Sequence, residues 1–206
     1  ISLASLSGSS DLESLSDIGL LTQAGYLTIK AVEYGNTVFL DYPNLEVKRA
    51  MGLLYTELLL KGKVAGQVGA GDIVQVLRNG DPEEVFHTLN RLFTAIDYQN
   101  YPVTDEATVR AFIQVYLAGA GLDSKVERHN SHGRSDLEVK VGARLWVFEL
   151  KTAHEEKSAD AALQEAFDQL TSRRYGEQDA VEKLERVALV FSLSERRFVR
   201  WAAVTN

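Results

Sequence analysis

The order of apolar and polar residues in the first half of the chain predicts helices and one short hairpin. Residues 11–21 and 45–60 place apolar side chains at helical spacing, whereas residues 26–30 and 37–40 alternate as strands do. Gly35-Asn36, between the two strands, supplies the residues of a tight turn. A helix followed by such a hairpin is typical of the end of a winged-helix unit.

Two further helices are expected before the pattern changes, at residues 69–78 and 82–97. The second begins with Asp81-Pro82, an N-cap residue followed by proline at the first helical position. The stretch after these helices contains Pro102 and few periodic apolar positions. We therefore expect a mainly helical, winged-helix-like linker domain at residues 1–100 and a second domain at residues 101–206.

The second half of the chain mixes helical and strand patterns. Helices are expected at residues 106–117 and 157–175, and strands at residues 125–129, 135–141, 145–150, 187–193 and 197–204. The run from 187 to 193 is almost wholly apolar, as a central strand buried on both faces is. This order of elements predicts an α/β fold in which a mixed sheet has a helix packed on each side.

The composition of the chain excludes some kinds of site and indicates a compartment. The 206 residues are 45% hydrophobic and 25% charged, which is ordinary for a globular protein, and they include no cysteine. Disulfides and thiolate metal sites are therefore excluded, which fits a cytoplasmic protein. No apolar run approaches the roughly 20 residues of a membrane span. The first residue is isoleucine rather than methionine, and we expect the sequence to be part of a longer protein.

The net charge of −7 argues mildly against nucleic-acid binding, because phosphate contacts usually make such proteins basic. The charge is uneven along the chain, however. Residues 1–100 contain 7 basic and 12 acidic residues, whereas residues 101–206 contain 15 and 17. The second half is close to neutral, so local basic clusters there can still contact phosphate.

Three ionisable residues in the second half form a pattern suited to metal chemistry. Asp136 lies near the start of one expected strand, and Glu149 and Lys151 lie near the end of the next. Residues i and i+2 of a strand point to the same face, so Glu149 and Lys151 project together while Leu150 points into the core. A hairpin about Gly142 would set Asp136 roughly opposite Glu149, with Cβ atoms about 4.5–5.5 Å apart.

Two carboxylates this close repel each other unless a cation lies between them. Mg²⁺ suits such a site, because it binds a few carboxylates and keeps water molecules. A metal there can polarise a phosphoryl oxygen and lower the pKa of a bound water, and the Lys151 ammonium can orient that water or stabilise charge on the phosphate. The residue types therefore indicate metal-assisted phosphodiester hydrolysis. The competing interpretation is a solvated strand edge, for which an isolated Glu-x-Lys is common.

At these residues the sequence resembles the PD-(D/E)XK nuclease superfamily, and more narrowly the nuclease-like domain fused behind an AAA-ATPase-like domain in many bacterial proteins. Gly133-Arg134-Ser135-Asp136-Leu137 is similar to that group's Gly-Arg-x-Asp strand, and Phe148-Glu149-Leu150-Lys151 matches its Phe-Glu-Leu/Phe-Lys. The resemblance covers residues 105–204 and implies a restriction-endonuclease-like core. The chain contains no Gly-x-x-x-x-Gly-Lys-Ser/Thr phosphate-binding loop, so any ATPase core would lie upstream.

The resemblance also implies further members of the site. A glutamine of the next helix commonly faces the active site in this group, which makes Gln169 the candidate and Gln164 the alternative. The first helix often offers a glutamate, and Glu106 is in a suitable place, although acids are favoured in the first turn of any helix. Where the related group often carries a histidine in that helix, this chain has Arg110.

Basic residues near the site are candidates for contact with nucleic acid. Arg134 can hold a phosphate through two parallel hydrogen bonds. His132, in the loop before Asp136, and Arg173, near the end of the last expected helix, are further candidates. The competing interpretation for such loop histidines and charge runs is a solvated surface.

Together these features predict a nuclease domain dependent on Mg²⁺ or Mn²⁺ that acts on nucleic acid, with DNA favoured. Asp136 and Glu149 are expected to bind the metal, with Glu106 as a third candidate ligand, while Lys151 assists the attacking water and Gln169 supports the site. Two alternatives remain open. One is a catalytically silent module that keeps the nuclease fold within a larger ATPase, and the other is a toxin or defence component.

Overall fold

The computed structural model describes Ser2, Leu6 and residues 16–33, 35–130, 133–154, 156–172 and 182–204. The chain forms two compact units, Ile1–Met51 and Gly52–Asn206, and the division falls inside helix α3 (Leu45–Leu59). The domain boundary expected at residues 100 and 101 stays a prediction. None of the helices in the described part of the chain is long and apolar enough to cross a membrane.

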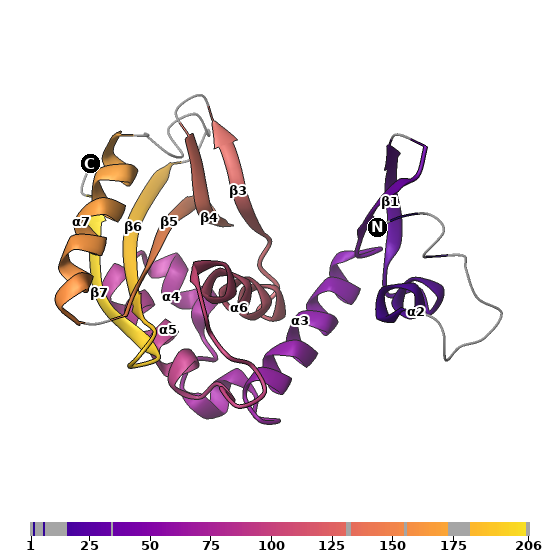
Figure 1. The fold of residues 1–206 in the computed structure, drawn as a ribbon, viewed down its shortest axis with the longest axis horizontal. Coiled ribbons are helices and arrows are strands. Elements are labelled where there is room, and N and C mark those ends of the chain that lie inside the picture. Colours follow the sequence, from indigo (N-terminus) through magenta and orange to yellow (C-terminus); the bar gives the residue numbers. More distant parts are fainter. Residues whose placement is uncertain are drawn as a thin grey trace. The chain divides into compact units, whose positions relative to one another are not determined.

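The first unit contains the expected helix and hairpin (Figure 1). In α2 (Asp17–Gln23) the N-cap Ser16 accepts a hydrogen bond from the amide of Gly19 at 3.1 Å. Strands β1 (Thr28–Glu33) and β2 (Thr37–Asp41) pair antiparallel. Gly35 in the turn between them has a φ of 76°, which glycine adopts without steric cost.

Three short helical segments follow α3 in the second unit. They are η2 (Ala65–Val68), α4 (Ile73–Asn79) and α5 (Pro82–Thr94). The helix expected from residue 69 begins only at Ile73, because Gly69 takes a left-handed conformation and ends η2. Gly80 ends α4 in the same way, with a φ of 79°.

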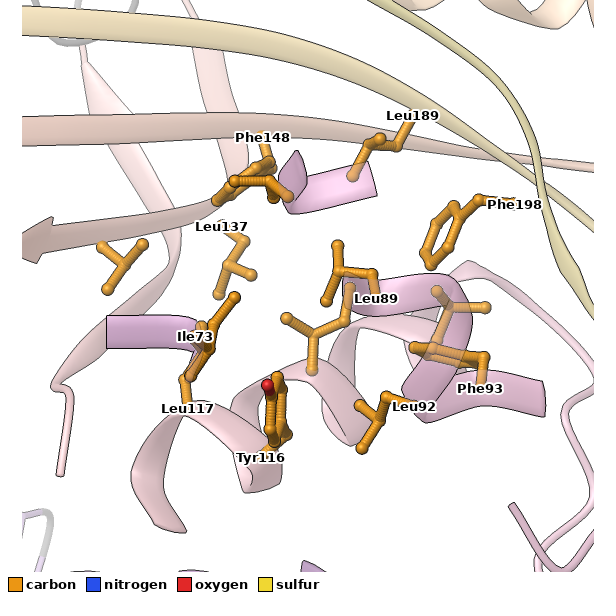
Figure 2. Close-up of a cluster of buried hydrophobic side chains, with 14 of the residues drawn as sticks. Ile73, Leu89, Leu92, Phe93, Tyr116, Leu117, Leu137, Phe148, Leu189 and Phe198 are labelled. Atoms are coloured by element: carbon orange, nitrogen blue, oxygen red, sulfur yellow. The ribbon is translucent and has the colours of Figure 1, made fainter. Parts of the chain in front are cut away.

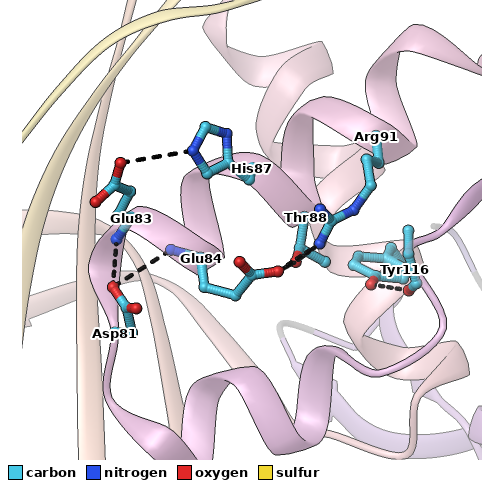
Figure 3. Close-up of polar contacts among 8 residues, drawn as sticks. Asp81, Glu83, Glu84, His87, Thr88, Arg91 and Tyr116 are labelled. Atoms are coloured by element: carbon cyan, nitrogen blue, oxygen red, sulfur yellow. Dashed lines mark hydrogen bonds and ion pairs between the residues drawn. The ribbon is translucent and has the colours of Figure 1, made fainter.

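Helix α5 begins where the sequence predicted, at the cap formed by Asp81 (Figure 3). The Asp81 carboxylate accepts hydrogen bonds from the amides of Glu83 and Glu84 at 3.0 and 3.4 Å. The helix ends at Thr94 rather than at residue 97, because the chain then turns back towards α3. There the amide of Asp97 donates to the carbonyl oxygen of Leu59 at 2.7 Å.

After helix α6 (Glu106–Gly119) the second unit builds a sheet of five strands. These are β3 (Ser124–Asn130), β4 (Gly133–Val141), β5 (Arg144–Ala153), β6 (Lys183–Ser192) and β7 (Arg197–Val204), in that spatial order. All neighbours are antiparallel except β5 and β6, which are parallel and joined by helix α7 (Glu156–Ser172). A parallel pair needs such a crossover.

Helices cover both faces of this sheet (Figure 1). On one face, Trp146, Phe148 and Leu150 of β5 join the large core contributed by α4, α5 and α6 (Figure 2). On the other, Leu145 and Val147 pack against Ala166 and Leu170 of α7. This alternation along β5 confirms the mixed α/β fold and is consistent with a restriction-endonuclease-like core.

Two glycines allow α3 and α6 to approach closely within the second unit. A Cβ atom on Gly52 would lie 2.7 Å from the carbonyl carbon of Ala118 and closer still to the amide nitrogen of Gly119. Thr56, one turn after Gly52, donates to the carbonyl oxygen of Gly52 at 2.7 Å. Backbone rather than a flexible side chain blocks the space, so a larger residue would force the helices apart.

The substitution Gly52→Ala should therefore lower the free energy of unfolding by about 1–3 kcal/mol, the usual cost of overpacking. Urea unfolding followed by circular dichroism measures this change. Gly66→Ala is the matched control, since a Cβ atom there meets nothing within 4 Å. Equal stability of the two variants would contradict a close helix contact.

Candidate active site

Strands β4 and β5 direct three ionisable side chains to the sheet face covered by α7. Leu137 and Leu150 belong to the core on the opposite face. Because side chains alternate along a strand, Asp136, Glu149 and Lys151 point the other way. The turn at Gly142 has a φ of 61°, and the pairing of β4 with β5 sets Leu137 opposite Phe148. One further step along both strands reaches Asp136 and Glu149, as the sequence predicted.

The Asp136 side chain is anchored to the backbone of the neighbouring strand. Its Oδ2 accepts a hydrogen bond from the amide of Leu150 at 2.8 Å. Leu150 directly follows Glu149, so this bond holds the two acidic residues in a defined relation.

Glu149 and Lys151 differ in their surroundings. Glu149 is only 3% exposed, whereas Lys151 is partly exposed. Partial burial acts to lower the pKa of Lys151, but a hydrogen bond to Glu165 and the charges of Glu106, Glu165 and Glu149 outweigh burial and raise that pKa. Lys151 is therefore held as an ammonium ion beside carboxylates.

Helix α7 contributes Glu165, which sequence reasoning missed. Its Oε1 lies 3.0 Å from Nζ of Lys151 and accepts a hydrogen bond from Nε2 of Gln169 at 3.2 Å. Gln164 instead donates to Asp168 at 2.8 Å. Of the two candidate glutamines, Gln169 is thus the one linked to Lys151, through Glu165. The spacing of four residues between Glu165 and Gln169, which puts both on one helix face, could have found it.

Helix α6 brings Glu106 to the same group of charges. Asp105 caps this helix by accepting from the amide of Thr108 at 2.8 Å, which places Glu106 in the first turn. Oε2 of Glu106 is buried and has no hydrogen-bond partner among the described residues. Burial raises the pKa of Glu106, and the negative charge of Asp136 adds to the rise, while the Lys151 ammonium opposes it.

Arg110, one helical turn after Glu106, is the second site residue that sequence reasoning did not assign. Its Nη1 lies 3.3 Å from Oδ1 of Asp136, and both side chains are mostly buried, with exposed fractions of 16% and 21%. The spacing of four residues from Glu106 put Arg110 on the same helix face. Only the approach of α6 to β4 could show that this face meets Asp136.

The remaining candidates lie outside what the structure describes. His132 and Arg173 are not among the described residues, and Arg134 belongs to β4 but its side chain is not described. Their expected contacts with nucleic acid stay predictions.

The charges collected at this edge of the sheet are net negative, which favours a cation. Four carboxylates, from Glu106, Asp136, Glu149 and Glu165, face two cations, Lys151 and Arg110, which leaves an excess of two negative charges. The buried Oε2 of Glu106 is an oxygen donor of the kind that Mg²⁺ prefers. Among the described residues, however, no three acidic or histidine side chains lie close enough together to form a complete metal cluster.

The raised pKa of Glu106 predicts that the free energy of unfolding depends on pH. A carboxyl with a higher pKa in the folded chain binds its proton more tightly there, so the free energy of unfolding falls as pH rises from about 4.5 through the folded-state pKa. Glu106→Gln removes this loss, and without metal the variant should gain stability relative to the parent between about pH 4 and pH 7. Urea unfolding at both pH values measures it. Glu83→Gln, on the exposed first turn of α5, should show no such gain.

The contact between Glu165 and Lys151 predicts a second titration effect. Glu165→Gln removes a charge and weakens a hydrogen bond that both raise the pKa of Lys151, so that pKa should fall. NMR titration of the Lys151 side chain measures it. Asp168→Asn serves as control. It removes the negative charge of a side chain on the same helix that accepts a hydrogen bond from Gln164 instead of contacting Lys151. An unchanged Lys151 pKa in Glu165→Gln would refute the contact.

Two comparisons relate this chain to known proteins. The chain is 31% identical, over 198 residues, to an uncharacterized protein in the vnfD 5′ region of Azotobacter chroococcum mcd 1. That alignment covers 90% of this chain but 37% of the relative, so the chain spans little more than a third of the relative's length. Residues 104–201, which contain Glu106, Asp136, Glu149 and Lys151, match the model of the PD-(D/E)XK nuclease superfamily.

Proposed function

We propose that the part of the chain from residue 101 to 206 is a metal-dependent nuclease that hydrolyses phosphodiester bonds of nucleic acid. One observation carries this proposal: Asp136, Glu149 and Lys151 share one face of the sheet, amid an excess of negative charge that a divalent cation would balance. The match of residues 104–201 to a nuclease superfamily supports a nuclease fold at the same residues.

In this proposal Asp136 and Glu149 are metal ligands, and Glu106 is a third. The hydrogen bond from Leu150 orients Asp136, and the buried Oε2 of Glu106, which has no hydrogen-bond partner among the described residues, could bind the cation. Mg²⁺ or Mn²⁺, when bound, supplies a Lewis acid that polarises the phosphate and lowers the pKa of a water molecule.

The protein's own side chains would then orient the reactants. The Lys151 ammonium, kept charged by its acidic neighbours, can hold the attacking water or stabilise negative charge that develops on the phosphate. Glu165 positions Lys151 through their 3.0 Å contact, and Gln169 in turn positions Glu165. Lys151 would therefore be a catalytic residue, and the two residues of α7 would be positioning residues.

The setting of this activity is also proposed. DNA is the favoured substrate, and the cytoplasm is the favoured compartment because the chain has no cysteine. We further propose that an AAA-ATPase-like domain precedes the nuclease domain in the full-length protein. The long Azotobacter relative, of which this chain spans 37%, leaves room for such a domain.

A catalytically silent nuclease-fold module is the second candidate function. The contact between Arg110 and Asp136 favours it, because a guanidinium already neutralises one expected metal ligand. The incomplete metal cluster among the described residues points the same way.

The nuclease proposal predicts cleavage of DNA by the purified chain with Mg²⁺ or Mn²⁺, with RNA tested in parallel. Asp136→Asn and Lys151→Ala should each lower the cleavage rate on the order of 10²–10³-fold, because each removes a group that acts on the transition state. Asp160→Asn and Lys157→Ala are matched controls on exposed positions of α7 and should cut like the parent. The assay is the loss of a fluorescently labelled oligonucleotide.

Equal cleavage by parent, Asp136→Asn and Lys151→Ala would show that the assignment is wrong. If neither the parent nor any variant cleaves, and calorimetry finds no Mn²⁺ binding at millimolar metal, the domain is a catalytically silent nuclease-fold module instead.

A further inference from the structure

Arg110 places a positive charge beside Asp136, one of the proposed metal ligands. Its guanidinium lies 3.3 Å from Oδ1 of Asp136, and both side chains are largely shielded from water. A positive charge at this distance repels an incoming cation, and partial burial strengthens the repulsion because little solvent screens it. We propose that Arg110 determines the metal affinity of this site: it pairs with Asp136 in the metal-free protein and moves to the phosphate of a bound substrate, which leaves Asp136 to the metal. The inference rests on the proposed function.

The chemistry of arginine means that Arg110 competes with a metal for Asp136 at every physiological pH. A guanidinium stays protonated at any physiological pH and has no lone pair to offer, so it cannot become a metal ligand. A neutral histidine in the same turn of α6 could donate a ring nitrogen to the metal. Arg110 can therefore compete with a metal for Asp136 but cannot bind that metal itself.

Asp136 cannot easily turn away from Arg110. Its Oδ2 accepts a hydrogen bond from the amide of Leu150 at 2.8 Å, which restrains the carboxylate while Oδ1 lies towards the guanidinium. A metal that binds Oδ1 must therefore displace Arg110 or tolerate it nearby. Arg110 and Glu106 leave the same face of α6, so the displaced guanidinium stays beside the carboxylates.

A substrate phosphate offers the displaced side chain a better partner. Guanidinium groups bind phosphate through two parallel hydrogen bonds, and the phosphate brings the negative charge that Arg110 loses when it leaves Asp136. Metal and phosphodiester should then bind cooperatively, each making the other's site available, and the coupling is reciprocal by thermodynamic necessity.

Mn²⁺ binding measured by electron paramagnetic resonance tests this inference without any need for cleavage. Arg110→Gln keeps a polar side chain but removes the charge, and it should bind Mn²⁺ about tenfold more tightly than the parent, or more. Arg110→Lys keeps the charge and should stay close to the parent. Arg91→Gln is a matched control, since it removes a positive charge paired with Glu84 on the surface of α5.

A second measurement adds a short phosphorothioate DNA duplex that resists cleavage. The duplex should tighten Mn²⁺ binding to the parent by several-fold and should have a clearly smaller effect on Arg110→Gln, in which no guanidinium needs to move. The same titrations yield the affinity for the duplex at several Mn²⁺ concentrations, and it should rise by the same factor.

The outcomes separate this inference from the function on which it rests. If the parent binds Mn²⁺ and Arg110→Gln binds it no more tightly, Arg110 does not compete and only the inference fails. If neither the parent nor Arg110→Gln binds Mn²⁺ at millimolar concentration, the metal site itself is absent and both proposals fail. Tight binding by Arg110→Gln together with weak binding by Arg110→Lys supports the inference, and equal tightening in both overturns it.

Discussion

Burial of the Glu149 carboxylate beside an anchored Asp136 is the constraint on which this edge of the sheet depends. A buried charge is costly unless nearby groups compensate it, and here the compensation comes both from the same strand and from a helix far away in the sequence. Lys151 follows on the same strand, Arg110 arrives from α6, and the amide of Leu150 binds Asp136 directly. The packing of α6 and α7 against β4 and β5 places Arg110 beside Asp136 and Glu165 beside Lys151.

The two helices that contact these charged residues, α6 and α7, lie on opposite faces of the sheet and contribute different groups. Helix α7 joins the parallel strands β5 and β6, and its packing through Ala166 and Leu170 sets Glu165 against Lys151. Helix α6 belongs to the other layer and reaches the site only with its first turns. The position of α6 along its axis matters for that reason, and the close approach of Gly119 to Gly52 helps to define it. Thirteen residues of helix, about 20 Å, separate this contact from Glu106.

The net negative charge of the chain matters differently for the whole molecule and for the edge of the sheet where the carboxylates gather. A net charge of −7 seen as a whole disfavours nucleic acid, but four carboxylates gathered at one edge suit a cation that would itself contact phosphate. Arg110 and Lys151 keep the cluster from being overwhelmingly negative in the absence of that cation. The same two groups are suited to phosphate once it arrives, so compensation within the protein and recognition of substrate use the same side chains.

The sequence by itself determined the strands of the second unit, the hairpin about Gly142 and the common face of Asp136, Glu149 and Lys151, because these depend on local rules of turn and strand geometry. The cap at Asp81 followed from equally local chemistry. The early end of α5 and the late start of α4 did not, since one depends on a contact with α3 and the other on a glycine conformation. Only the tertiary structure decided that Arg110 meets Asp136 and that Glu165 meets Lys151. Helical spacing shows which residues share a face, but which face meets the sheet depends on the packing of the whole core.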